Sequence, residues 1–179
     1  FGAFTAVDKL HLSIRQGEVY TILGHNGAGK TTALYMLTGV LKASGGDATV
    51  YGHRISDQMD RVQQNLGLCQ QFDVLFDQLT VKEHLELVCE IKCMPRAEVS
   101  NAVSDTLLKV MLSEHRDKKA IELSGGMKRK LSLAMAIVTR PRVIILDEPT
   151  SGLDVESRRQ VWKLIKTLKQ GRSIIMSSQ

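Results

Sequence analysis

Short apolar runs alternate with amphipathic segments along most of the chain. Short apolar runs bounded by glycine and polar turn residues are typical of strands. They predict strands at 17–23, 65–70, 142–148 and 173–178, and a β-hairpin or edge strand at 45–52. The segments between them predict helices over 31–40, 79–94, 96–112, 123–138 and 154–171. The alternation predicts an α/β fold, and the continuous apolar run "RVIILDE" indicates a buried parallel strand.

Two consecutive helices interrupt this alternation in the middle of the chain. Thr80 is followed three residues later by Glu83, the pattern of a capping box, and Pro95 separates the two helices. The length of 179 residues suits one domain with a substantial core. We therefore expect a single domain over 1–179, with a core of about 1–75 and 124–179 and a helical insertion of about 76–123.

A glycine-rich turn follows the first predicted strand. The stretch "GHNGAGKT" fits the pattern GxxxxGK[ST], in which glycines let backbone N–H groups converge on phosphate oxygens at the start of a helix. In such a loop Lys30 reaches the β- and γ-phosphates, and the Thr31 hydroxyl is a ligand for Mg²⁺. An ordinary glycine turn is disfavoured because a strand precedes the loop and a helix follows it. The predicted nucleotide-binding residues here are Gly24, Asn26, Gly27, Gly29, Lys30, Thr31 and Thr32.

Two carboxylates stand at the carboxyl end of the apolar run 142–148. Ligands bind at the carboxyl ends of strands in open α/β sheets. Asp147 can hold Mg²⁺, and Glu148 can orient and deprotonate an attacking water. Alone, such a pair is more often a solvated turn. Together with the glycine-rich loop it predicts a P-loop NTPase, with a RecA-like, mostly parallel sheet and a small antiparallel part.

A second glycine pair opens the helix at 123–138. Ser124, Gly125 and Gly126 leave helix N–H groups exposed, which predicts either a simple N-cap or a second anion-binding site. Their position 23 residues before Asp147 favours the second interpretation. The basic run Lys128–Lys130 that follows predicts a solvated helix side; contact with a coupling helix or with lipid headgroups is the less favoured alternative.

Five motifs in order resemble the nucleotide-binding domain of ATP-binding cassette (ABC) transporters, from Phe1 to Gln179. These are Walker A "GHNGAGKT", the Q-loop "CQQFD", the signature "LSGGM", Walker B "VIILDE" and the D-loop "SGLD". The wording of "FDVLFDQLTVKEHL" and "LSGGMKRKLSLA" is most similar to subfamily A, whose members are large transporters often linked to lipids. The resemblance implies an ATPase on the cytoplasmic side of a multi-pass membrane protein, with ATP and Mg²⁺ bound.

The resemblance also implies partners and site residues. Two such domains pair head to tail, so the residues Ser124, Gly125 and Gly126 contact the γ-phosphate bound to a second nucleotide-binding domain. Gln71 senses Mg²⁺ and the attacking water, and its loop touches the transmembrane domains. Asp154 lies at the dimer seam. Phe1 falls near the adenine-stacking aromatic, with Phe4 as the alternative, and a core phenylalanine is equally compatible with either position.

The chain departs from the family pattern at two positions. Gln70 stands where subfamily A usually has proline, which changes the stiffness of the loop. Gln179 falls near the switch histidine; either glutamine replaces it, keeping a neutral hydrogen bond to the γ-phosphate, or the histidine follows directly. The family's last strands and helices are also missing, so we expect a C-terminally incomplete domain.

Composition and motif spacing disfavour some partners and some other classes of ABC protein. The net charge is +5, but the cations are scattered and aromatic residues make up 4%, so nucleic acid is not an expected partner. Cassettes that act on DNA ends carry a long coiled-coil insertion, whereas 52 residues separate Gln71 from Ser124. A soluble ribosome-associated cassette and a degenerate, ATP-binding regulatory cassette remain open; Glu148 argues against the second, and Gln179 argues for it.

Overall fold

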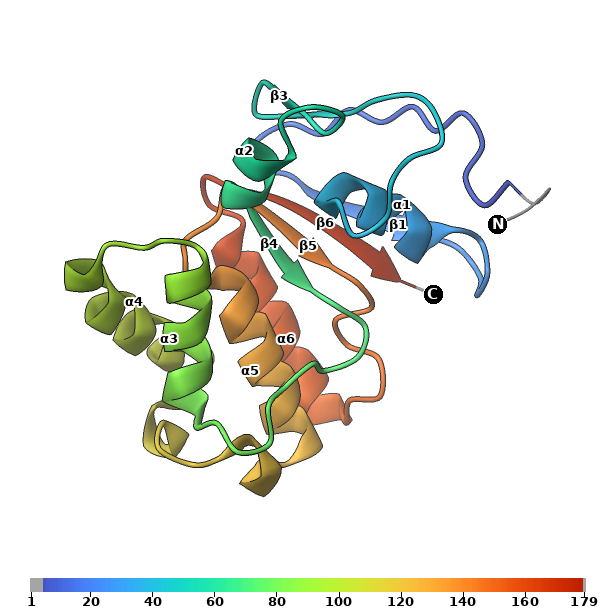
Figure 1. Cartoon of the computed structure of the whole chain (residues 1–179). Helices are drawn as coiled ribbons and strands as arrows, with labels where there is room; N and C mark the ends of the chain where they lie inside the picture. The colour runs from blue at the N-terminus through green and yellow to red at the C-terminus, as the bar shows by residue number, and fades with distance from the viewer. Residues whose placement is uncertain (1–4, 179) are drawn as a thin grey trace.

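The computed structural model describes residues 5–178, so the predictions for Phe1, Phe4 and Gln179 lie outside the described residues. Within this range the chain forms a four-stranded sheet of order β1-β6-β5-β4, in which every neighbouring pair is parallel (Figure 1). Its strands are β1 (Val19–Leu23), β4 (Leu66–Cys69), β5 (Val143–Leu146) and β6 (Ser173–Ser178). A separate antiparallel pair consists of β2 (Thr49–Val50) and β3 (His53–Arg54). The predicted α/β fold, with its small antiparallel part, is confirmed.

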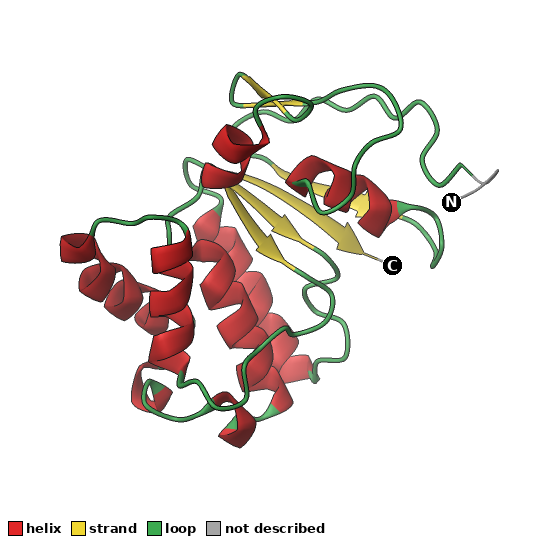
Figure 2. Cartoon of the chain, viewed as in Figure 1, coloured by secondary structure: helices red, strands yellow, loops and turns green. Residues whose placement is uncertain are grey.

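Helices cover both faces of the parallel sheet (Figure 2). On one face, Val143 and Ile145 of β5 pack with residues of α1 (Lys30–Thr38) and α2 (Met59–Gln64). On the other face, Ile144 and Leu146 pack with α5 (Gly125–Ile137) and α6 (Val155–Leu168). Because β5 is buried on both faces, its sequence is a continuous apolar run instead of an alternating one.

The two central helices pack against α5. They are α3 (Val81–Ile91) and α4 (Arg96–Lys109), followed by 3₁₀ turns at Ser113–His115 and Ala120–Glu122. The capping box forms as predicted: the Glu83 amide donates to Thr80 Oγ1 at 3.1 Å, and the Thr80 amide donates to Glu83 Oε2 at 2.7 Å. Buried residues of both helices, such as Leu85 and Leu107, belong to the same apolar cluster as α5 and α6. The insertion and the sheet therefore share one continuous core.

The structure differs from the sequence predictions mainly at the ends of elements and at one short helix. The helices predicted over 79–94 and 154–171 are shorter, and the predicted hairpin is displaced to 49–54. Helix α2 was not predicted, because among its six residues only Val62 is buried and one buried residue shows no period. Among residues 5–178, no helix is both long enough and apolar enough to span a bilayer.

Candidate nucleotide-binding site

The candidate site lies where the parallel strands end. The glycine-rich loop follows β1, Gln71 follows β4 after one residue, and Asp147 follows β5 directly. Since β6 lies between β1 and β5, and β4 lies beside β5, all of these segments meet at one edge of the sheet. The topology therefore assembles residues from distant parts of the sequence at the edge where α/β proteins bind ligands.

The loop between β1 and α1 needs its glycines for conformation and for space. Gly27 and Gly29 have φ angles of 81° and 85°, in the left-handed region that side chains rarely adopt. A Cβ on Gly29 would lie 2.2 Å from the carbonyl oxygen of Ala6. Gly29 is also the N-cap of α1, and no side chain caps this end of the helix. The first-turn amides of α1 are thus available to an anion.

Lys30 lies inside this loop as a buried cation with 7% of its surface exposed. Its Nζ donates to the carbonyl oxygen of Gly24 at 2.5 Å and to that of His25 at 3.1 Å. Nζ also lies 3.9 Å from Oε1 of Glu148. The ammonium group is therefore held by the loop backbone and faces the carboxylate that follows β5.

The turn after β5 is held by Ser177 of β6. Ser177 Oγ donates to Asp147 Oδ1 at 2.5 Å and accepts from the Glu148 amide at 2.9 Å. Asp147 is fully buried, and its Oδ2 has no hydrogen-bond partner. Burial, and after it the charge of Asp147, raise the pKa of the Tyr35 phenol on α1. A buried carboxylate oxygen without a partner is costly unless a cation or water approaches it.

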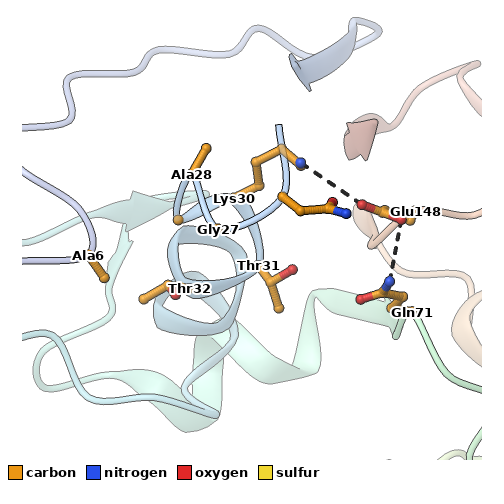
Figure 3. A pocket seen from close by; sticks show the side chains of 10 residues that line it. Ala6, Gly27, Ala28, Lys30, Thr31, Thr32, Gln71 and Glu148 are labelled. Atoms are coloured by element: carbon orange, nitrogen blue, oxygen red, sulfur yellow. Dashed lines mark hydrogen bonds and ion pairs between the residues drawn. The ribbon is translucent and has the colours of Figure 1, made fainter. Parts of the chain in front are cut away.

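Glu148 has a φ of 45° and is 9% exposed. Gln71 Nε2 donates to Glu148 Oε2 at 3.4 Å, and Figure 3 shows Lys30 and Gln71 both directed at this carboxylate. These groups border a cavity of about 520 Å³, a size typical of small-ligand sites. The cavity is lined by Ala6, Asn26, Gly27, Ala28, Gly29, Lys30, Thr31, Thr32, Gln71 and Glu148. Of the predicted loop residues, only Gly24 is not part of this lining.

The signature residues and Asp154 lie outside this cavity. Ser124 is exposed and caps α5, with its Oγ accepting from the Met127 amide at 3.3 Å. Asp154 caps α6, and hydrogen bonds from Ser157 lower the pKa of its carboxyl group. A Cβ on Gly126 would lie 2.8 Å from Ser157 Oγ, so the two helix starts adjoin each other. They form the end of the molecule away from α1 (Figure 1).

The prediction that Lys128–Lys130 forms a solvated side of α5 is wrong for Arg129, which is 3% exposed. Its guanidinium group donates to five backbone carbonyl groups and to Asp73 Oδ1. The sequence contained a sign of this burial. Arg129 lies four positions before Leu133 and seven before Ala136, and these residues form a second buried stripe on α5. A helix buried on most sides leaves little room for a solvated face.

The predicted Mg²⁺ ligands are too few to form a metal site from protein side chains alone. No group of three or more His, Cys, Asp or Glu side chains within 5–178 could hold a metal ion. Thr31, Gln71 and Asp147 offer a hydroxyl, an amide oxygen and one carboxylate. Such a sparse oxygen set suits Mg²⁺, which usually keeps several waters and binds together with substrate phosphates.

Comparison with known proteins agrees with this geometry. One solved structure, an ATP-binding subunit of an ABC transporter, matches with a TM-score of 0.87 and 26% identity over 99% of this chain and 75% of its own. A second, a dimeric post-hydrolysis ATP-binding cassette bound to ADP and Pi, has a TM-score of 0.87 and 25% identity over 97% of this chain and 79% of its own. The fold and the loop after β1 are those of a P-loop NTPase.

The sequence comparisons identify the family. The model of the ABC transporter family matches residues 7–151. Rat ATP-binding cassette sub-family A member 2 is 47% identical over 97% of this chain, and human glucosylceramide transporter ABCA12 is 46% identical over 99%. The chain belongs to the ABC transporter family and is one of its ATP-binding, ATPase-type domains. It spans 7% of the length of both relatives.

Proposed function

We propose that this chain is the ATP-hydrolysing domain that powers lipid translocation by a subfamily A transporter. The observation that carries the proposal is the convergence of Lys30, Gln71 and Glu148 on one cavity at the carboxyl ends of β1, β4 and β5. A cation, an amide and a carboxylate at such an edge meet the needs of phosphoryl transfer to water.

Each of these groups has a distinct role in the proposal. The amides of the loop and Lys30 bind the β- and γ-phosphates of ATP. The Glu148 carboxylate accepts a proton from a water that attacks the γ-phosphorus, while the bond to the β-phosphate oxygen breaks. The Gln71 amide, which contacts Glu148 at 3.4 Å, orients that water. The narrow spacing of these groups supports their action on one reacting phosphate.

The residues in and beside the cavity also fit Mg²⁺: Thr31 and Gln71 line it, whereas Asp147 is buried next to Glu148 and is not part of the lining. Thr31, Gln71 and Asp147 would hold the ion, and the buried Oδ2 of Asp147, which has no hydrogen-bond partner, would contribute negative charge to it. When bound, Mg²⁺ neutralises charge that develops on the phosphate oxygens. Ser177 keeps the carboxylate of Asp147 in one orientation through its 2.5 Å hydrogen bond.

A second nucleotide-binding domain completes the site in this proposal. Ser124, Gly125 and Gly126 lie outside the cavity of their own chain, and Ser124 and Gly125 are exposed. They therefore suit contact with the γ-phosphate held by a partner, as Asp154 suits the seam between the two domains. The dimeric arrangement of the solved cassette bound to ADP and Pi supports this interpretation.

The transport step is proposed from the relatives. Human ABCA3 is named a phospholipid-transporting ATPase and is 43% identical over 97% of this chain, which amounts to 10% of its own length. We infer that transmembrane domains of the parent protein are the partners, that the domain faces the cytoplasm, and that residues 76–123 form its helical subdomain.

ATP-dependent translocation of a labelled phospholipid in vesicles, with the intact protein reconstituted, tests the proposal. Wild type should translocate the lipid, Glu148→Gln should not, and the exposed Glu98→Gln should behave like wild type as a charge-matched control. Translocation that is independent of ATP would refute the coupling. High-affinity ATP binding without turnover would favour the regulatory cassette, and co-sedimentation with ribosomes would favour the soluble one.

A further inference from the structure

We propose that Arg129 is a positioning residue for ATP hydrolysis, because its guanidinium group ties the Q-loop to the turn that carries Glu148. The inference rests on the proposed function, since it concerns the geometry of the same two catalytic side chains. Arg129 itself does not border the cavity. It acts through the backbone on both sides of the site.

The first set of contacts fixes the Q-loop. Arg129 Nη1 donates to the carbonyl oxygen of Gln70 at 2.6 Å and to that of Gln71 at 3.2 Å. The same nitrogen lies 3.2 Å from Asp73 Oδ1, which supplies the opposite charge. The peptide groups on both sides of the Gln71 Cα are therefore pinned, and the direction of the Gln71 side chain follows from them.

The second set of contacts fixes the turn after β5. Arg129 Nη2 donates to the carbonyl oxygens of Asp147 at 3.1 Å and Glu148 at 3.0 Å. Nε donates to that of Pro149 at 2.9 Å. Glu148 has a φ of 45°, a conformation that costs energy for a residue with a side chain. Three consecutive carbonyl groups bound to one cation help to hold the turn in that conformation.

A guanidinium group suits this place and an ammonium group does not. Arginine presents five N–H donors in a rigid plane and stays charged, whereas lysine offers one nitrogen. Six acceptors from two segments surround Arg129, and the single nitrogen of a lysine, with three N–H donors, cannot satisfy all of them. Since Arg129 lies on α5, which is capped by Ser124 and begins at Gly125, the same side chain links the signature helix to both catalytic segments.

The intact protein with Arg129→Gln, Arg129→Lys and Asp73→Asn tests the inference, with Lys130→Gln as a charge-matched control on the same helix. Steady-state hydrolysis of MgATP gives kcat and KM. Hydrogen exchange of the amides in 70–74 and 147–151 reports the order of the two segments, with 19–31 and α3 as internal references for global unfolding.

For Arg129→Gln we expect kcat to fall by about 10²-fold, because small misplacements of catalytic groups have effects of this size. KM for ATP should stay within about twofold, since the phosphate loop is untouched. Arg129→Lys should be intermediate, and Asp73→Asn milder because the carbonyl contacts persist. Exchange should rise in 70–74 and 147–151 only.

A wild-type kcat in both Arg129 variants, or a higher KM with unchanged kcat, would overturn the inference. If Arg129→Gln does not fold, the kcat of Arg129→Lys tests the inference: a reduced kcat supports it, and a wild-type kcat overturns it. If wild type hydrolyses no ATP, the proposed function fails. The exchange pattern then tests separately whether Arg129 ties the two segments together: unchanged exchange in both segments overturns this tie, and increased exchange confined to them supports the tie alone, without a role in hydrolysis.

Discussion

Gly67→Ala tests a close approach between strand β4 and helix α5. Gly67 lies in the middle of β4, and a Cβ there would lie 1.8 Å from the carbonyl oxygen of Ala136 on α5 and 2.9 Å from Pro141 Cγ. Real Cβ atoms essentially never come closer than 3.0 Å, so β4 and α5 must separate by at least 1.2 Å. The added Cβ lies on β4 and the Ala136 carbonyl oxygen belongs to the backbone of α5, so neither atom can move away by a change of side-chain rotamer.

We expect this change to destabilise the domain by about 3 kcal/mol, the upper end of the usual cost of overpacking. For a domain of this size, that lowers Tm by about 6–12 °C. Because Gln71 follows β4 after one residue, ATP turnover should also fall. Thermal unfolding and turnover of the intact protein measure both effects.

Gly45→Ala is the matched control, because no atom lies within 4 Å of a Cβ at Gly45 and its φ angle is not in the left-handed region. It should leave Tm unchanged or raise it slightly, since alanine restricts the unfolded chain. If Gly67→Ala melted within about 2 °C of wild type, less than 1 kcal/mol would separate them, and the close packing of β4 on α5 would be refuted.

Two further predictions concern single side chains. Ser177→Ala should lower kcat by about tenfold and destabilise the domain by about 2 kcal/mol, because it leaves the buried Asp147 carboxylate and the Glu148 amide without this hydroxyl; unchanged turnover and Tm would contradict this role. At pH 8, a thiol reagent should modify the exposed Cys93 and spare Cys69, because burial raises the pKa of the Cys69 thiol to about 12 and keeps it protonated. Peptide mapping by mass spectrometry measures this, and equal labelling of both would show that Cys69 is accessible.

Local patterns in the sequence predicted most of the fold. Strand β5 and helix α6 were found because an apolar run and a 3.6-residue period each reflect burial directly. The start of α3 was found because Thr80 and Glu83 cap the helix through contacts three residues apart. Helix α2 was missed because Val62 is its one fully buried residue, and one such residue shows no period.

The residues that hold the catalytic segments in place, Arg129 and Ser177, could not be predicted from local sequence patterns. The loop after β1 has a fixed pattern because its glycines and Lys30 act within one turn. Arg129 instead contacts carbonyl groups up to 59 positions away in the sequence, and carbonyl groups are the same in every residue. Ser177 contacts Asp147, which lies 30 positions away in the sequence. No residue pattern around a serine near the end of a strand indicates such a contact.

Release of phosphate from MgATP by the purified intact protein, compared between wild type and Glu148→Gln, tests the proposed hydrolysis most directly. If Glu148 is the general base, wild type releases phosphate continuously and Glu148→Gln releases it at least about 10²-fold more slowly, while ATP binding persists. Glu98→Gln should release phosphate at the wild-type rate. Equal rates in wild type and Glu148→Gln would contradict the assignment of ATP hydrolysis to this site.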